Sequence, residues 1–186
     1  MLEIALYSLL ALAVIIGAVV VYASRRPDTF QVSRSVSIAA PAETIFPLIN
    51  DLRKFSTWSP FDKKDSNMAR VYSGPDRGVG QRLDWDGNRE IGKGWFSIIG
   101  SAPSSKVDME LTMIKPMSAR NQVSFTLIPE GASTNVTWSM QGQVPLFAKV
   151  LHLFIDMEKM CGDDFSEGLA SLKAMAEGPA VLSAQS

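Results

Sequence analysis

Apolar and polar residues alternate over most of the chain between residues 30 and 143, as they do in strands that bury one face. Seven such runs occur, at residues 30–38, 69–73, 81–86, 92–99, 105–114, 120–129 and 134–143. Turn-forming residues separate consecutive runs, for example Gly74-Pro75-Asp76 and Glu130-Gly131. Short turns between neighbouring strands favour an antiparallel meander, so we predict a curved antiparallel sheet of seven strands.

Two short helices are predicted between the first strand and the second. Residues 41–52 carry an apolar side and begin with Pro41, which suits the first turn of a helix. The segment 54–63, KFSTWSPFDK, follows as a second short helix that ends before Pro60.

The C-terminal part of the chain has a helical period. Apolar residues recur at three- and four-residue steps from Val150 to Leu172, and predict one helix of about thirty residues that ends near Glu177. A sheet with one apolar face must cover it, and this helix is the long amphipathic element available. We therefore predict an α+β fold in which the sheet wraps around the C-terminal helix and leaves a cavity between them.

The first two dozen residues have a different character. Residues 4–23 carry no charge, and as a helix they span about 30 Å, the thickness of a bilayer core. We predict a transmembrane anchor over residues 1–26, a ligand-binding domain over 27–178 and a flexible tail over 179–186. A cleaved signal peptide is the alternative, since Val21-Tyr22-Ala23 resembles a cleavage site, although the start of the chain lacks Lys and Arg.

Arg25 and Arg26 directly follow the apolar run and form its basic flank. Positive residues beside a membrane span tend to stay in the cytoplasm. We accordingly expect a single-pass protein of the bacterial inner membrane with its soluble domain in the cytoplasm. The opposite topology remains the alternative.

Composition excludes several classes of function. Among 186 residues, 18 Lys and Arg stand against 19 Asp and Glu, so there is no overall positive charge to hold nucleic acid. One cysteine, Cys161, cannot form an intrachain disulfide, and one histidine, His152, cannot build a zinc site of Cys and His. Asp84 and Asp86 lie on the water-facing side of a predicted strand, so we expect no metal site and no cofactor.

Several sequence motifs resemble those of the SRPBCC superfamily, the START-like helix-grip proteins. The similarity extends over residues 29–177 and is closest to the branch of polyketide cyclases/dehydrases and lipid-transport proteins, in a form with an N-terminal membrane anchor. The motifs are RSVSIAAP at 34–41, WSPF at 58–61, YSGP at 72–75, GVG at 78–80, DMEKM at 156–160 and DF at 164–165. The resemblance implies a helix-grip fold, and the superfamily holds carriers, enzymes and regulators on one scaffold.

Residues at the inward-facing positions of the predicted strands and helices would line the candidate ligand cavity. Its candidate lining residues are Trp58, Phe61, Trp85, Phe96, Met109, Trp138, Met140, Phe154 and Arg34. Within KFSTWSPFDK we expect Phe55 to pack in the core, and Trp58 and Phe61 to lie at the cavity mouth. The alternative is that the same large side chains fill the core completely.

Three polar or reactive residues are candidates for chemistry. Arg34 falls in the apolar phase of its strand, where it either pairs with Glu158 or Asp156 or contacts a ligand head group. His152 could move a proton, but no acid–base partner is identifiable, so we assign no catalytic residue. Cys161 lies in the apolar phase of the C-terminal helix and is expected to act as a small buried hydrophobe.

Three functions follow as hypotheses. The first is a membrane-anchored carrier or binding domain for a hydrophobic small molecule or lipid, which residues 4–23 would hold beside the bilayer. The second is an enzyme of the cyclase or dehydratase type, which requires an acid–base pair in the cavity. The third is a regulatory, protein-binding domain with a filled core.

Overall fold

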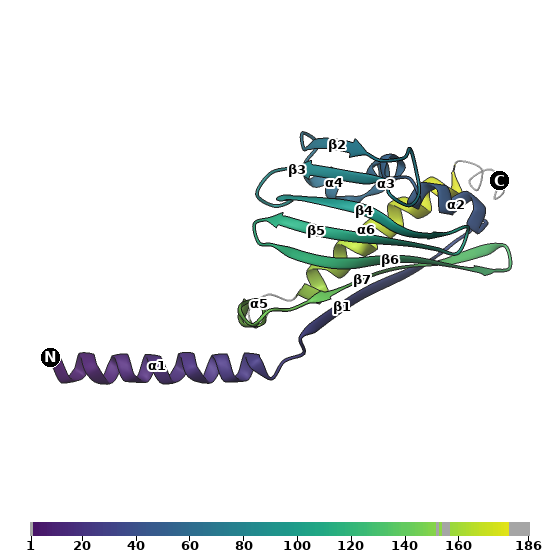
Figure 1. The fold of residues 1–186 in the computed structure, drawn as a ribbon. Coiled ribbons are helices and arrows are strands. Elements are labelled where there is room, and N and C mark those ends of the chain that lie inside the picture. Colours follow the sequence, from purple (N-terminus) through teal and green to yellow (C-terminus); the bar gives the residue numbers. More distant parts are fainter. Residues whose placement is uncertain (1, 152, 154–156, 179–186) are drawn as a thin grey trace.

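The computed structural model describes residues 2–151, 153 and 157–178. Its centre is one antiparallel sheet of seven strands in the order β1-β7-β6-β5-β4-β3-β2, curved around a C-terminal helix (Figure 1). The strands are β1 (Thr29–Ile38), β2 (Ala69–Ser73), β3 (Arg82–Asp86), β4 (Lys93–Ala102), β5 (Lys106–Lys115), β6 (Ala119–Glu130) and β7 (Ser133–Gln143). The predicted α+β fold with seven antiparallel strands is confirmed.

The helices are α1 (Leu2–Ser24), α2 (Ala42–Ile49), α3 (Leu52–Trp58), α4 (Pro60–Lys64), α5 (Leu146–Leu151) and α6 (Met157–Glu177). α1 projects away from the sheet, and α6 crosses the concave, inner face (Figure 1). We call the end of the sheet where β1 begins and β7 ends the proximal end, because α1 and α5 lie there. The opposite end is the distal end.

Three short helices, not two, connect β1 with β2. The predicted stop before Pro60 is real, but Pro60 then opens α4 as its first residue, where its missing N–H is no loss. Asp51 caps the preceding helix, since its carboxylate accepts a hydrogen bond from the Arg53 N–H at 2.9 Å.

The prediction of one C-terminal helix of about thirty residues is wrong in its first part. α6 has 21 residues and begins at Met157, whereas α5 is a separate helix of six residues and Leu153 lies in a turn after it. Two candidate site residues, His152 and Phe154, lie outside the described residues. The predicted tail at 179–186 also lies outside them.

An aromatic cluster fills the space between the sheet and α6. Trp138 of β7 stacks on Phe165 of α6, with ring centroids 4.3 Å apart, and Phe125 of β6 lies 4.9 Å from Trp138. Phe55 and Trp58 of α3 complete the cluster with edge-to-face contacts to both Phe125 and Trp138. These five side chains are at most 2% exposed, so burial of apolar surface here holds α3 and α6 against the sheet.

Two glycines let α6 approach its neighbours closely. A Cβ on Gly168 would lie 2.6 Å from Cζ3 of Trp138 and 3.0 Å from Cδ of Pro60. A Cβ on Gly162 would collide with the guanidinium of Arg34. The absence of a side chain at these two positions therefore lets Trp138, Pro60 and Arg34 lie directly against the helix.

The end of α6 is fixed to the end of β1. Glu177 accepts a hydrogen bond from the Ala39 N–H at 2.7 Å and pairs with Lys173 at 2.7 Å. These contacts, led by the Ala39 N–H, lower the pKa of the Glu177 carboxyl. The carboxylate thus stabilises the junction of α6 and β1 in its ionised form.

Candidate functional site

The inner face of the sheet is covered unevenly. In its distal half, side chains such as Ile38, Val107 and Val136 are fully buried. Near the proximal end, the inward-pointing residues of four strands are only half-buried. They are Phe30 of β1, Leu111 and Met113 of β5, Asn121 of β6 and Gly142 of β7. Cys161 in the first turns of α6 is half-buried as well. The apolar inner face is therefore least covered at the end next to α1 and α5.

Trp85 lies at this proximal end, and its indole N–H, like that of Trp138 in the core, is buried without a partner among the described residues. Its ring lies over Gly94 of the neighbouring strand, where a Cβ would come within 2.7 Å of Cζ2 of Trp85. The ring packs against Phe96, with centroids 5.5 Å apart. An unpaired buried N–H costs about 1–3 kcal/mol, so a ligand oxygen that accepted from it would gain affinity.

Asn121 places a second polar side chain on the proximal inner face. Asn121, Gly142 and Phe30 lie on three adjacent strands, β6, β7 and β1, in one cross-strand row. Gly142 has no side chain to fill this row, and both the Asn121 amide and the Phe30 ring occupy the space that its Cβ would need. The row therefore presents an amide beside an aromatic ring, a pairing that suits a mostly apolar ligand with one polar end.

Arg34 is held by an ion pair on α6. Its Nη1 lies 2.8 Å from Oε1 of Glu158 and donates to the Ser33 carbonyl at 2.8 Å. The Arg34 side chain is 32% exposed and that of Glu158 is 61% exposed. An ion pair this open contributes about 0–1 kcal/mol, so it leaves the guanidinium able to change partners. Of the two interpretations of Arg34, pairing with Glu158 is the arrangement found.

The predicted lining residues divide into two groups. Trp58, Met109 and Trp138 are at most 1% exposed, and the indole N–H of Trp58 donates to the Leu48 carbonyl at 2.9 Å. Trp58 is thus part of the packed core and does not lie at a cavity mouth, because α3 directs it under the aromatic cluster. That Phe55 packs in the core is confirmed, at 2% exposed.

The other predicted lining residues lie nearer the open end. Trp85, Phe96 and Met140 are 7–8% exposed, and Phe61 of α4 is half-buried against the core. Whether any of them contacts a ligand stays a prediction.

Charged side chains tie α4 to its surroundings beside Cys161. Lys64 Nζ lies 2.8 Å from Asp164 of α6 and 3.3 Å from Glu90 in the loop between β3 and β4. Burial acts to lower the pKa of Lys64, but these two carboxylates outweigh it and leave the pKa raised. Burial, with the nearby Asp164 charge, raises the pKa of the Cys161 thiol. Cys161 is therefore a protonated, half-buried side chain, and an unfavourable nucleophile.

Asp62, also on α4, has a raised carboxyl pKa. Burial is the main cause, and it outweighs the hydrogen bond and charge of Arg70, which act in the opposite direction. Arg70 Nε donates to Asp62 at 2.8 Å, so the pair joins α4 to β2. The described residues contain no group of three or more His, Cys, Asp or Glu side chains that could hold a metal ion.

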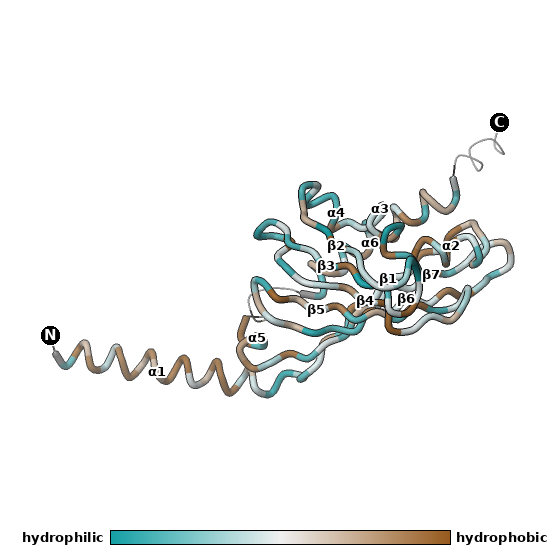
Figure 2. Tube along the Cα trace, turned by 45° about the horizontal axis from the view of Figure 1, so that its top comes forward, coloured by the Kyte–Doolittle hydropathy of each residue, from teal (hydrophilic) through white to brown (hydrophobic). Residues whose placement is uncertain are grey.

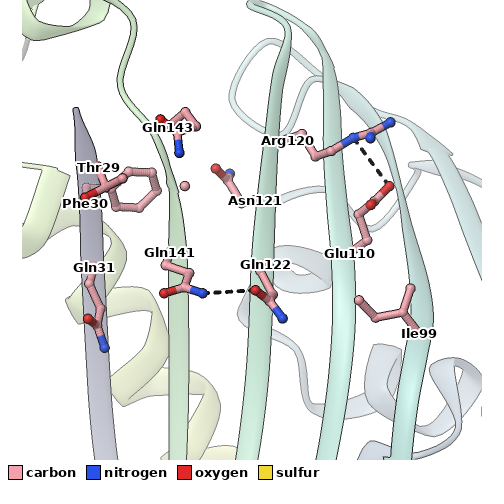
Figure 3. Close-up of a pocket in the computed structure, with 11 residues that line it drawn as sticks. Thr29, Phe30, Gln31, Ile99, Glu110, Arg120, Asn121, Gln122, Gln141 and Gln143 are labelled. Atoms are coloured by element: carbon pink, nitrogen blue, oxygen red, sulfur yellow. Dashed lines mark hydrogen bonds and ion pairs between the residues drawn. The ribbon is translucent and has the colours of Figure 1, made fainter.

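Three hollows surround the proximal end. One of about 540 Å³ lies along β1, β7, β6 and β5, where the outward side chains of Gln31, Gln122 and Gln141 line it together with Phe30, Asn121 and Gly142 (Figure 3). A smaller one, of about 140 Å³, lies between β1 and α5. The third, of about 890 Å³, lies between the end of α1, the turn from β5 to β6, and α5. These hollows therefore lie at the end of the domain that α1 joins.

Sequence reasoning missed the role of Asn121 and of Phe30 in this region. Both follow the inward phase of their strands, at 121–123–125–127 and 30–32–34–36, so alternation alone could have placed them. What alternation could not show is that both residues are only half-buried in the folded chain.

The chain matches the model of the family described as "Polyketide cyclase / dehydrase and lipid transport" over residues 29–177. None of the curated proteins matches it.

Solved structures that are similar in fold come from distant organisms. The Mll3558 protein of Rhizobium loti is 16% identical, with 78% of this chain and 96% of that one covered at a TM-score of 0.59. The Aha1 dimer of Colwellia psychrerythraea is 18% identical, with 80% of this chain and 96% of that one covered at a TM-score of 0.57. The major latex-like protein 151 of Panax ginseng is 12% identical, with 82% of this chain and 100% of that one covered at a TM-score of 0.58. At these identities the likeness concerns the fold alone.

Proposed function

This chain belongs to the polyketide cyclase/dehydrase and lipid transport family, and on that premise we propose that it binds a hydrophobic small molecule or lipid at the proximal inner face of its sheet, beside a membrane that α1 spans. The observation that carries the proposal is the half-covered apolar surface of Phe30, Leu111 and Met113. Apolar side chains at the inner face of a sheet normally end up covered, and here these three are only half-buried.

The polar groups of the site suggest what kind of ligand fits. The Trp85 indole is a buried, unpaired donor, and the Asn121 amide can both donate and accept. Arg34 adds a cation on the same side of the sheet, although Glu158 now neutralises it. An acyl chain or isoprenoid that carries a carbonyl, hydroxyl or carboxylate end matches this set.

The membrane part of the proposal rests on α1. Residues 3–24 form a helix that is long and apolar enough to cross a bilayer, at about 33 Å, although a signal sequence would satisfy the same criteria. Tyr7 and Tyr22 lie near its two ends, as aromatic residues do at membrane interfaces. Arg26 donates to the Tyr22 hydroxyl at 3.0 Å, which suits a position at the lipid head groups. Tethering would keep the binding domain at high local concentration beside apolar cargo.

The cytoplasmic orientation is proposed from Arg25 and Arg26. Fusions of alkaline phosphatase and of a green fluorescent protein after residue 28 test it. A fluorescent fusion without phosphatase activity supports the cytoplasmic side, and strong phosphatase activity without fluorescence contradicts it.

Ligand binding is tested with two neighbouring residues that point to opposite faces of β5. Met113 belongs to the inner face, whereas Ile114 belongs to the outer face and is 48% exposed. The full chain in nanodiscs is titrated with fluorescent fatty-acid and isoprenoid probes. We expect Met113→Gln to weaken binding about tenfold, because an amide against an apolar ligand costs about 1–3 kcal/mol. Ile114→Gln should leave binding unchanged, and equal effects of the two variants would contradict the site.

A further inference from the structure

α5 exposes its apolar side chains and buries its charged one, the reverse of a helix that faces water. Its only charged residue, Lys149, is 5% exposed, whereas Leu146, Phe147 and Leu151 are 47%, 53% and 39% exposed. At 100° per residue, Phe147 and Leu151 lie on one side of the helix with Lys149 opposite them, and Leu146 lies between the two sides. Figure 2 shows the apolar character of α5 beside the mainly apolar α1. A water-facing helix would have the reverse arrangement.

Lys149 fixes α5 to the end of α1. Its ammonium group donates to the Arg26 carbonyl at 2.7 Å and pairs with Asp28 at 2.5 Å. Both partners belong to the linker that joins α1 to β1. The buried lysine therefore holds the exposed apolar side of α5 at the level where α1 ends.

Other parts of the proximal end reach the same level. In Figure 1 the turn from β3 to β4, the turn from β5 to β6, and α5 all point to the side from which α1 extends. Met117, in the turn from β5 to β6, is 47% exposed. Arg25 and Arg26 follow α1, and Lys115 and Arg120 flank the turn from β5 to β6; all four are exposed, as is the acidic Asp28 beside α5. Basic residues next to exposed apolar side chains suit a leaflet with anionic head groups.

We infer that α5 is an interfacial helix, which inserts Leu146, Phe147 and Leu151 into the leaflet where α1 ends and seats the proximal end on the bilayer surface. The inference rests on the proposed membrane span of α1, and it adds a second, peripheral contact with lipid. Continuity with α1 is what favours lipid over a protein partner as the cover of this surface. When the proximal end is seated on the bilayer in this way, the hollow between α1 and α5 opens at the level of the lipid head groups.

The experiment measures the depth of single positions in the full chain. Cys161 is replaced by Ala, and an NBD fluorophore is attached to a new cysteine in the variants Phe147→Cys, Ile128→Cys and Leu10→Cys. Phe147 and Ile128 are equally exposed, at 53% and 54%, but Ile128 lies at the distal end of β6. The proteins are reconstituted in nanodiscs of phosphatidylcholine and phosphatidylglycerol, with and without lipid that carries a doxyl quencher near the head group.

We expect the doxyl lipid to lower the emission of the label at position 147 about twofold, because an interfacial helix lies about 5–10 Å into the head-group region. The label at position 128 should be unaffected. An unquenched label at 147 beside a quenched label at 10 would overturn the inference and leave the α1 anchor standing. A blue-shifted but unquenched label at 147 would mean that protein covers α5, which also overturns it. If the label at 10 is unquenched, the anchor and the inference both fail.

Discussion

At the scale of single residues, glycines and one indole define how closely the inner face is packed. Gly168 is the sharper case, because Ala in place of Gly in a helix normally stabilises a protein by about 0.5–1 kcal/mol. Here the added methyl would meet Trp138 and Pro60, both of which are held in the core.

We predict that Gly168→Ala lowers the free energy of unfolding by about 1–3 kcal/mol, the usual cost of overpacking. Chemical denaturation monitored by tryptophan fluorescence measures it. Ala170→Ser, at an exposed position of the same helix, is the control and should change stability by less than about 0.5 kcal/mol. A stabilised Gly168→Ala variant would show that α6 is not packed as described.

The Trp85 indole gives a prediction about ligand chemistry. Trp85→Phe keeps an aromatic ring and removes the unpaired N–H, so it should weaken binding of a pyrene-labelled fatty acid about fivefold, the value of one hydrogen bond. Binding of an alkylpyrene of equal length should change less, since it offers no acceptor. Trp95→Phe, on the outer face of the neighbouring strand, is the matched control. Equal losses for both probes would mean that the N–H contacts no ligand.

At the scale of elements, periodicity located strands better than helix boundaries. Residues 69–73 were predicted with the bounds of β2, and the other six strands to within a few residues, because alternation changes sharply at each turn. The pattern after Pro145 continues through both α5 and the start of α6, so it could not reveal that they are separate helices. That separation matters for the account because α5, as an element of its own, packs beside α1.

The junction of α6 with β1 makes the stability of the fold depend on pH through the Glu177 carboxyl. Because the folded-state pKa of Glu177 lies below its ordinary value of 4.5, the unfolded chain takes up the proton first as the pH falls. The stability that Glu177 contributes is thus fully present above about pH 4.5 and is lost as the pH falls below it.

Glu177→Gln keeps an acceptor for the Ala39 N–H but cannot ionise. We predict that this variant is less stable than the wild type at pH 7 and that the difference disappears towards pH 3. Thermal unfolding at a series of pH values measures it. A difference that is constant across this range would contradict the assignment of the stabilisation to the carboxylate.

At the scale of the whole molecule, the fold was easier to predict from the sequence than the site. The seven-stranded helix-grip fold was predictable from alternation, turn residues and the motifs at residues 34–41 and 58–61. The site was predictable only in part, because Trp138 has the same inward phase as Trp85 yet lies in the closed core. Which inward residues stay half-buried depends on what packs against them, and this is a tertiary property.

The most direct test of the central claim, that the domain holds a hydrophobic ligand, is native mass spectrometry of the full chain released from nanodiscs after mild extraction. The account predicts an added mass that corresponds to one lipid-like molecule, retained by Ile114→Gln and lost or reduced in Met113→Gln. A chain that carries no added mass, and that also fails to take up fatty-acid or isoprenoid probes, would contradict it.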